Sequence, residues 1–136
     1  MNKTVFMLED DTDDRYITRE TLEELNITVP VQFFNSSNAL FETLAAGEIP
    51  SLILLDYNAV PENGIQVLKQ LKAKPGYASI PVVILSDSDQ PFFRDECYRF
   101  GASSYIKKPS SFEGTHQKIG TFFKYWMEVA EVQMSS

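Results

Sequence analysis

The chain has 136 residues, of which 43% are hydrophobic and 23% charged, proportions typical of one soluble globular domain that buries its own core. Its formal net charge of −7 argues against a protein that binds the phosphate backbone of nucleic acids. The chain contains neither the roughly 20 consecutive apolar residues of a membrane span nor the apolar run of a signal peptide.

Short apolar runs alternate with helical patterns from the amino terminus onward. The run Thr4–Leu8 predicts a buried strand, and a helical pattern follows it to about Asn26. A second strand is expected at Val31–Phe34. Asn35–Ser37 can cap the next helix, which we expect to end at Gly47.

The stretch Ser51–Asp56 predicts the central strand of the fold. Four consecutive apolar residues lead directly into Asp56, without the alternation of a half-exposed strand. Such a run is typical of a strand buried on both faces of a parallel sheet that helices cover. The carboxylate at its end therefore stands at the carboxyl edge of the sheet, where open α/β folds place their ligands.

The second half of the chain continues the alternation. A helical pattern after the loop at Gly64 ends at the turn Pro75–Gly76. Ile80–Leu85 predicts a fourth buried strand, and the helix after it stops at Gly101. A last strand at Ser103–Ile106 and a long final helix complete the pattern.

Five strands alternating with five helices predict a doubly wound, flavodoxin-like α/β fold with a parallel sheet, (βα)5. Only Gln133–Ser136 follow the last helix, so we expect a single domain, residues 1–136, without an output domain. The single cysteine, Cys97, cannot form an internal disulfide, which fits a reducing compartment. We therefore expect a cytoplasmic protein.

Polar side chains follow four of the predicted strands. Glu9 and Asp10 follow the first, and Asp56, Ser86 and Lys108 follow the third, fourth and fifth. Because the carboxyl ends of parallel strands share one edge, these groups should lie together. Clustered carboxylates repel one another, and a hard divalent cation such as Mg²⁺ is their natural counter-ion.

With these motifs the chain resembles the receiver domain of bacterial two-component response regulators, along nearly its whole length. The resemblance implies that Asp56 accepts a phosphoryl group. It implies that Ser86 binds a phosphoryl oxygen and that Lys108, directly before Pro109, pairs with the phosphoryl group. Tyr105 matches the aromatic switch position of the family. The chemistry fits these residue types, because phosphoryl transfer needs positioning and neutralisation of charge.

The same resemblance implies a Mg²⁺ site. Glu9 and Asp10 match the acidic pair that holds the ion, with Asp10 as a direct ligand and Glu9 acting largely through water. Asp56 supplies a further carboxylate, and the backbone carbonyl of Asn58 completes the set.

The sequence departs from the family pattern at three places. Val60 stands where the family usually has a proline, and Pro61 comes one residue later. Asp87 stands where a small residue is usual, and Ser86 replaces the commoner threonine. Because every group with a chemical role is kept, we expect these departures to change rates and leave the function intact.

Two other functions remain open at this level. A phosphatase of the haloacid dehalogenase type also places a nucleophilic Asp after a buried strand, but it has a second Asp as general acid where this chain has Asn58. A degenerate receiver would act purely as an interaction module. We expect a response regulator that is no enzyme beyond its own phosphotransfer and autodephosphorylation.

The resemblance implies a sensor histidine kinase or a phosphotransfer protein as partner. The carboxyl-terminal run, from Lys107 through Val129, is similar to that of stand-alone receivers paired with phytochrome-like kinases. Neither a nucleic acid nor a membrane is expected as partner.

The final helix has an unusually wide apolar surface. At about 100° per residue, one group forms a core-facing stripe, namely Phe112, Ile119, Phe123, Trp126 and Ala130. A second group lies beside it, namely Phe122, Tyr125, Val129 and Val132. The combined arc of roughly 220° is about twice what packing against one sheet needs. We predict that the second group is a contact surface, either in a homodimer, which we favour, or with a kinase.

Overall fold

Five parallel strands form one sheet in the order β2-β1-β3-β4-β5. The computed structural model describes residues 4–59, 62–108 and 111–126. The strands are β1 (Val5–Leu8), β2 (Val31–Phe34), β3 (Leu52–Asp56), β4 (Val82–Ser86) and β5 (Ser104–Lys107). The helices are α1 (Thr12–Glu24), α2 (Ser37–Ala45), α3 (Gly64–Ala73), α4 (Pro91–Arg99) and α5 (Phe112–Lys124).

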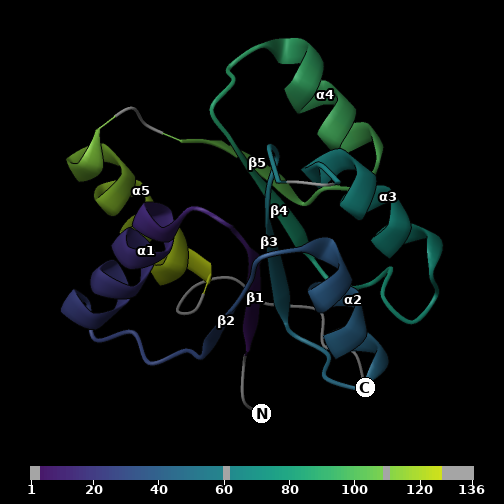
Figure 1. The fold of residues 1–136 in the computed structure, drawn as a ribbon. Helices are drawn as coiled ribbons and strands as arrows, with labels where there is room; N and C mark the ends of the chain where they lie inside the picture. The colour runs from purple at the N-terminus through teal and green to yellow at the C-terminus, as the bar shows by residue number, and fades with distance from the viewer. Residues whose placement is uncertain (1–3, 60–61, 109–110, 127–136) are drawn as a thin grey trace.

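Helices cover both faces of the sheet. Helices α1 and α5 lie together on one face, and α2, α3 and α4 lie on the other (Figure 1). The strand order changes direction between β1 and β3, so the loops after these two strands flank the central crevice of the carboxyl edge. The predicted doubly wound, flavodoxin-like fold is confirmed.

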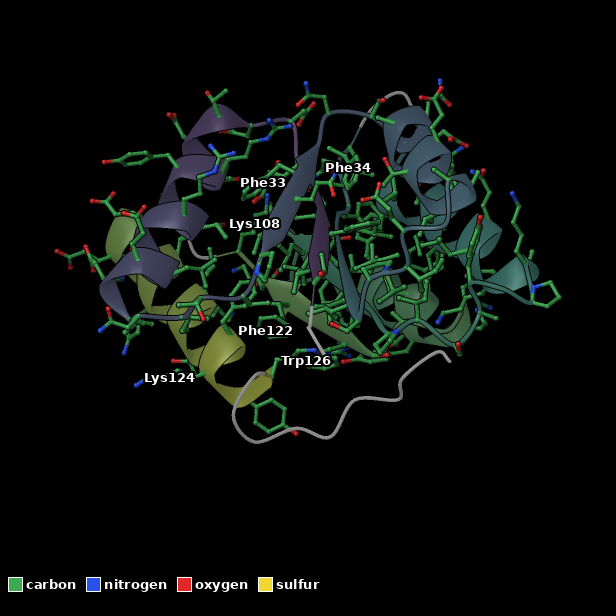
Figure 2. The ribbon with its side chains drawn as sticks, turned by 90° about the horizontal axis from the view of Figure 1, so that it is seen from below. Phe33, Phe34, Lys108, Phe122, Lys124 and Trp126 are labelled. Atoms are coloured by element: carbon green, nitrogen blue, oxygen red, sulfur yellow. The ribbon has the colours of Figure 1, made fainter. Side chains whose placement is uncertain are left out.

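The apolar runs of the sequence occupy the centre of the sheet. Every residue of β1, β3 and β4 is buried, whereas the edge strands β2 and β5 are partly exposed. Successive residues of β2 point to opposite faces, so that Phe33 lies on the α1 side and Phe34 on the α2 side (Figure 2). A separate apolar core therefore fills each side of the sheet.

Several element boundaries differ from the prediction by one or two residues, and two of these differences have a clear local reason. Strand β4 begins at Val82, because the Ile80 N–H donates to the Tyr77 carbonyl in the preceding turn, 3.1 Å away. Helix α1 ends at Glu24, because Asn26 adopts the left-handed conformation with φ 55°.

Phe122, which is predicted to belong to the second group on the final helix, is half-buried. Phe123 is buried, as predicted, but Phe122 also packs against the core on the α1–α5 side. Its ring stacks on Trp126, with centroids 5.9 Å apart, and Figure 2 shows the two side by side on α5. Tyr125 is 55% exposed and is the described member of the second group that remains at the surface. Val129, Ala130 and Val132 lie outside the described residues.

Within the described part of the chain, no helix is long and apolar enough to cross a membrane. Cys97 is fully buried in the core on the α3–α4 side, and this burial, assisted by the charge of Glu96, raises the pKa of its thiol to about 11. The cysteine therefore behaves as a core residue.

Candidate functional site

The structure brings together the carboxylates predicted for the carboxyl edge. Oxygen atoms of Glu9, Asp10 and Asp56 all lie within 4.8 Å of one another. Glu9 and Asp10 follow β1, and Asp56 is the last residue of the neighbouring strand β3. These carboxylates lie beside an open polar hollow lined by Asp10, Asp11, Asp14, Asp56, Asn58, Asp87, Lys108 and Thr115.

Glu9 is the most deeply buried member of this acidic group, with none of its surface exposed. Its Oε1 lies 2.9 Å from the Lys108 ammonium, and its Oε2 accepts the Asp11 N–H at 3.3 Å. Burial raises the pKa of Glu9 to about 8; the charge of Lys108 opposes the shift, and the charge of Asp56 adds to it. A cation beside Glu9 would favour its ionised form.

Asp56 is only 7% exposed, although it ends a strand. Its Oδ1 accepts the N–H of Asn58 at 3.1 Å and lies 3.6 Å from the Lys108 nitrogen. The hydrogen bond orients the carboxylate, and the ammonium stands close enough to attract charge that develops on it.

Backbone packing holds the loop after β3 close to Asp56. A Cβ on Gly64 would lie 2.9 Å from the Tyr57 Cα and 3.1 Å from the Asp56 carbonyl oxygen, so only glycine fits there. Glu62 accepts hydrogen bonds from the Ser37 hydroxyl and the Gln70 amide, at 2.7 and 2.5 Å. The unusual pair Val60 and Pro61 lies outside the described residues.

Lys108 joins three carboxylates across the edge of the sheet. Its ammonium donates to Glu9 and to Asp14, both at 2.9 Å, while Asp56 lies at 3.6 Å. Burial by itself would lower the pKa of Lys108, but the surrounding carboxylates, Glu9 foremost, raise it on balance. Lys108 is therefore charged at any physiological pH.

Sequence reasoning missed Asp14. It does not follow a strand but stands in the first turn of α1, where Asp11 accepts the N–H groups of Asp13 and Asp14 as the N-cap residue. The capping pattern could have placed Asp14 near the sheet edge. Only the tertiary contact shows that it reaches Lys108, 94 residues away in the sequence.

Ser86 and Tyr105 are connected through the loop after β4. The Ser86 hydroxyl accepts the N–H of Ser88 at 3.1 Å, and the Tyr105 hydroxyl donates to the Ser88 carbonyl at 2.6 Å. Ser86 itself is buried at the end of β4, and its carbonyl accepts the Lys108 N–H at 2.7 Å. Asp87, between the two serines, is exposed and lines the hollow.

The donor set of the hollow suits a hard cation. Three carboxylates supply oxygen atoms within a few ångströms of one another, and Asn58 stands beside them. Mg²⁺ prefers oxygen ligands and commonly uses one or two carboxylates together with water. The residues present therefore fit a divalent metal.

Comparisons with known proteins agree with this arrangement. Residues 5–120 match the family described as the response regulator receiver domain. The chain is 26% identical to a probable methanogenesis regulatory protein, FilR2, of Methanothrix harundinacea, over 90% of this chain and 83% of that protein. It is also 26% identical to response regulator Rcp1 of a Synechocystis strain, over 93% of this chain and 90% of that protein.

Solved structures show the same fold. The phosphorylated cyanobacterial phytochrome response regulator RcpA superposes with a TM-score of 0.90 and 26% identity, over 98% of this chain and 100% of that chain. The Mn²⁺-bound form of Rcp1 superposes with a TM-score of 0.89 and 23% identity, over 97% of this chain and 99% of that chain. With a family match over most of its length, this chain belongs to the response regulator receiver domains of two-component signalling.

Proposed function

We propose that this protein accepts a phosphoryl group on Asp56 from a histidine kinase or a phosphotransfer protein, and then signals by docking to a partner. The observation that carries the proposal is the position of Asp56, buried at the end of β3 with acidic residues on one side and the Lys108 ammonium at 3.6 Å. Because Asp56 is otherwise buried, its carboxylate can react with a phosphoryl donor only from the open hollow at the carboxyl edge of the sheet.

In the proposed transfer, a carboxylate oxygen of Asp56 attacks the phosphorus of a phosphohistidine. The new O–P bond forms as the P–N bond breaks, and the leaving imidazole takes up a proton. Lys108 and the Ser86 hydroxyl would bind oxygens of the phosphoryl group, which favours the transfer by holding its charge.

We propose Mg²⁺ as the cofactor. Asp10 and Asp56 would bind it directly, Glu9 largely through water, and Asn58 through its backbone carbonyl. When bound, the ion would supply positive charge in addition to that of Lys108. The Mn²⁺-bound form of the relative Rcp1 supports this choice of ion class.

Phosphorylation of Asp56 would be read through Ser86 and Tyr105. The phosphoryl group adds nearly two negative charges and new hydrogen-bond acceptors. The Ser86 hydroxyl accepts the Ser88 N–H and can donate its own proton to one of these oxygens. A shift of Ser86 toward the phosphoryl group would therefore pull on Ser88, whose carbonyl accepts the Tyr105 hydroxyl. Tyr105 is therefore proposed as the switch residue.

The partner is proposed to be a sensor kinase of the phytochrome type, in the cytoplasm. The support is the likeness to RcpA, a phytochrome response regulator, and to Rcp1 over nearly its whole length. By the same likeness we propose a single receiver domain that acts without an output domain, and whose chemistry is confined to its own Asp56.

A homodimer contact through the exposed side of α5 is proposed as a further element of this signalling. It rests mainly on Tyr125, which is 55% exposed, because Phe122 is already partly packed against the core. The haloacid dehalogenase alternative is not retained, since the family match covers residues 5–120 and Asn58 cannot serve as an acid.

The acceptor is tested with acetyl phosphate and Mg²⁺, followed by intact-mass spectrometry. The wild type should gain one phosphoryl group, and the near-isosteric variant Asp56→Asn should gain none. Asp95→Asn, the same change at an exposed site on α4, should behave as wild type. Labelling of Asp56→Asn would overturn the assignment, and a wild type that is never labelled would favour the degenerate receiver.

A further inference from the structure

We propose that Asp14 is a positioning residue that holds the Lys108 ammonium and competes for it with the phosphoryl group on Asp56. Nothing in the strand-end motifs points to this carboxylate. The inference rests on the proposed function of Asp56, because the competition concerns the group that Asp56 would carry.

Asp14 and Asp56 both lie close to the Lys108 ammonium, but at different distances. The Lys108 nitrogen lies 2.9 Å from Asp14 Oδ2 and 3.6 Å from Asp56 Oδ1. Only the first distance is that of a charge-assisted hydrogen bond. The ammonium is therefore hydrogen-bonded to Asp14 on α1 and not to Asp56.

Asp14 is held rigidly enough to keep this position. Its N–H donates to the Asp11 side chain at 3.2 Å, and its carbonyl accepts the Thr18 hydroxyl at 2.9 Å. Its side chain is 27% exposed and that of Lys108 15%, so water screens the pair only in part. A carboxylate on a fixed helical turn also loses less entropy when it forms an ion pair than a freely moving one.

The contact with Asp14 reduces the number of N–H donors that Lys108 can offer to a phosphoryl group. A lysine ammonium has three N–H donors, and Glu9 and Asp14 each occupy one. Asp14 also carries a negative charge that would repel an incoming phosphoryl group, since it lines the same hollow as Asp56. Removing that charge should free a donor and strengthen the interaction of Lys108 with a phosphoryl group.

Asp13 offers a matched control. It is the neighbouring aspartate of the same first turn, it is exposed, and Asp13→Asn removes the same charge from the same end of α1. In the described part of the chain, Lys108 forms its ion pairs with Glu9, Asp14 and Asp56, and none with Asp13. The change in net charge and the effect on the helix dipole are therefore common to both variants.

The first measurement is the affinity for beryllofluoride, a non-covalent analogue of the phosphoryl group, at saturating Mg²⁺. Asp14→Asn should bind it about fivefold more tightly than Asp13→Asn, the factor that corresponds to about 1 kcal/mol. Labelling by acetyl phosphate should accelerate in the same order. Equal affinities in the two variants, or weaker binding by Asp14→Asn, would overturn the inference.

The second measurement needs no phosphorylation. In the metal-free protein labelled with ¹⁵N at lysine, the Lys108 ammonium signal, assigned by its loss in Lys108→Arg, reports exchange with water. Exchange should accelerate in Asp14→Asn and stay unchanged in Asp13→Asn, and no acceleration would contradict the contact itself. A wild type that neither binds beryllofluoride nor takes up phosphate would instead refute the proposed function.

Discussion

Asp10 and Asp11 are adjacent carboxylates after β1, yet they are engaged differently. Asp11 caps α1, with its Oδ1 accepting the Asp13 N–H at 2.8 Å, whereas Asp10 belongs to the acidic group with Glu9 and Asp56. A carboxylate that caps a helix is not free to turn toward a metal. Asp10 is therefore placed to bind a cation, whereas Asp11 caps α1.

We predict that Asp10→Asn weakens Mg²⁺ binding by about tenfold or more, because it removes a direct oxygen ligand and its charge. Asp11→Asn should have a clearly smaller effect, since asparagine caps a helix as well as aspartate does. Isothermal titration with Mg²⁺ measures both. Equal losses would mean that the acidic pair is assigned one residue out of step.

Asp87 lines the hollow from the loop after β4. Its negative charge should repel a dianionic phosphoryl donor, so Asp87→Ala should accelerate labelling by acetyl phosphate, most visibly at low salt where charge is poorly screened. Asp89→Ala is the control. Asp89 is an exposed aspartate two residues further along, and its carboxylate lies 3.5 Å from the Lys107 ammonium. An unchanged or slower rate for Asp87→Ala in stopped-flow measurements would show that this carboxylate does not act on the donor.

At the scale of elements, the connection between β3 and α3 determines how Asp56 is presented. Gly64 begins α3 directly against the end of β3, and its N–H donates to the Tyr57 carbonyl at 2.9 Å. The neighbours of a Cβ at this position would be backbone atoms, which cannot move aside as the tip of a side chain can.

We predict that Gly64→Ala lowers the free energy of unfolding by about 1–3 kcal/mol and slows phosphorylation of Asp56, because the loop must shift. Gly76→Ala is the control, since nothing lies within 4 Å of a Cβ there. Urea denaturation gives the stability and acetyl phosphate labelling the rate. A Gly64→Ala protein as stable and as reactive as Gly76→Ala would refute the close approach.

Helix α5 shows how packing decides the use of an apolar arc. It lies beside α1 on the same face of the sheet, and a Cβ on Gly120 would come within 2.8 Å of Leu25 Cδ1 (Figure 1). The helix therefore has two packed sides, one toward the sheet and one toward α1. The packing against α1 accounts for part of the wide apolar arc. Phe122 packs partly against the core on the same face of the sheet.

At the scale of the whole molecule, we predict that the protein forms a homodimer that Tyr125→Glu weakens while the fold and the labelling of Asp56 persist. A charge at this exposed position opposes an apolar contact but disturbs no core. Phe122→Glu should instead lower the melting temperature, because it places a charge against the core. Sedimentation of a monomeric wild type at high concentration, with and without phosphorylation, would remove the dimer and leave kinase docking.

The sequence by itself determined the fold and the composition of the site edge. The apolar runs before Asp56 and Ser86 are unbroken, and unbroken runs between helical patterns are typical of a parallel sheet with both faces covered. Once the strands are parallel, the residues that follow them must share one edge. The sequence therefore predicts that Glu9, Asp10 and Asp56 lie together.

The tertiary structure alone decided the partners of these groups. The contact of Lys108 with Asp14 spans 94 residues and depends on the angle at which α1 leaves the sheet edge, which no local pattern encodes. The packing of Gly120 against Leu25 likewise depends on α1 lying beside α5. Local periodicity gives the direction of a side chain around its own helix, whereas its neighbour is set by the packing of elements distant in the sequence.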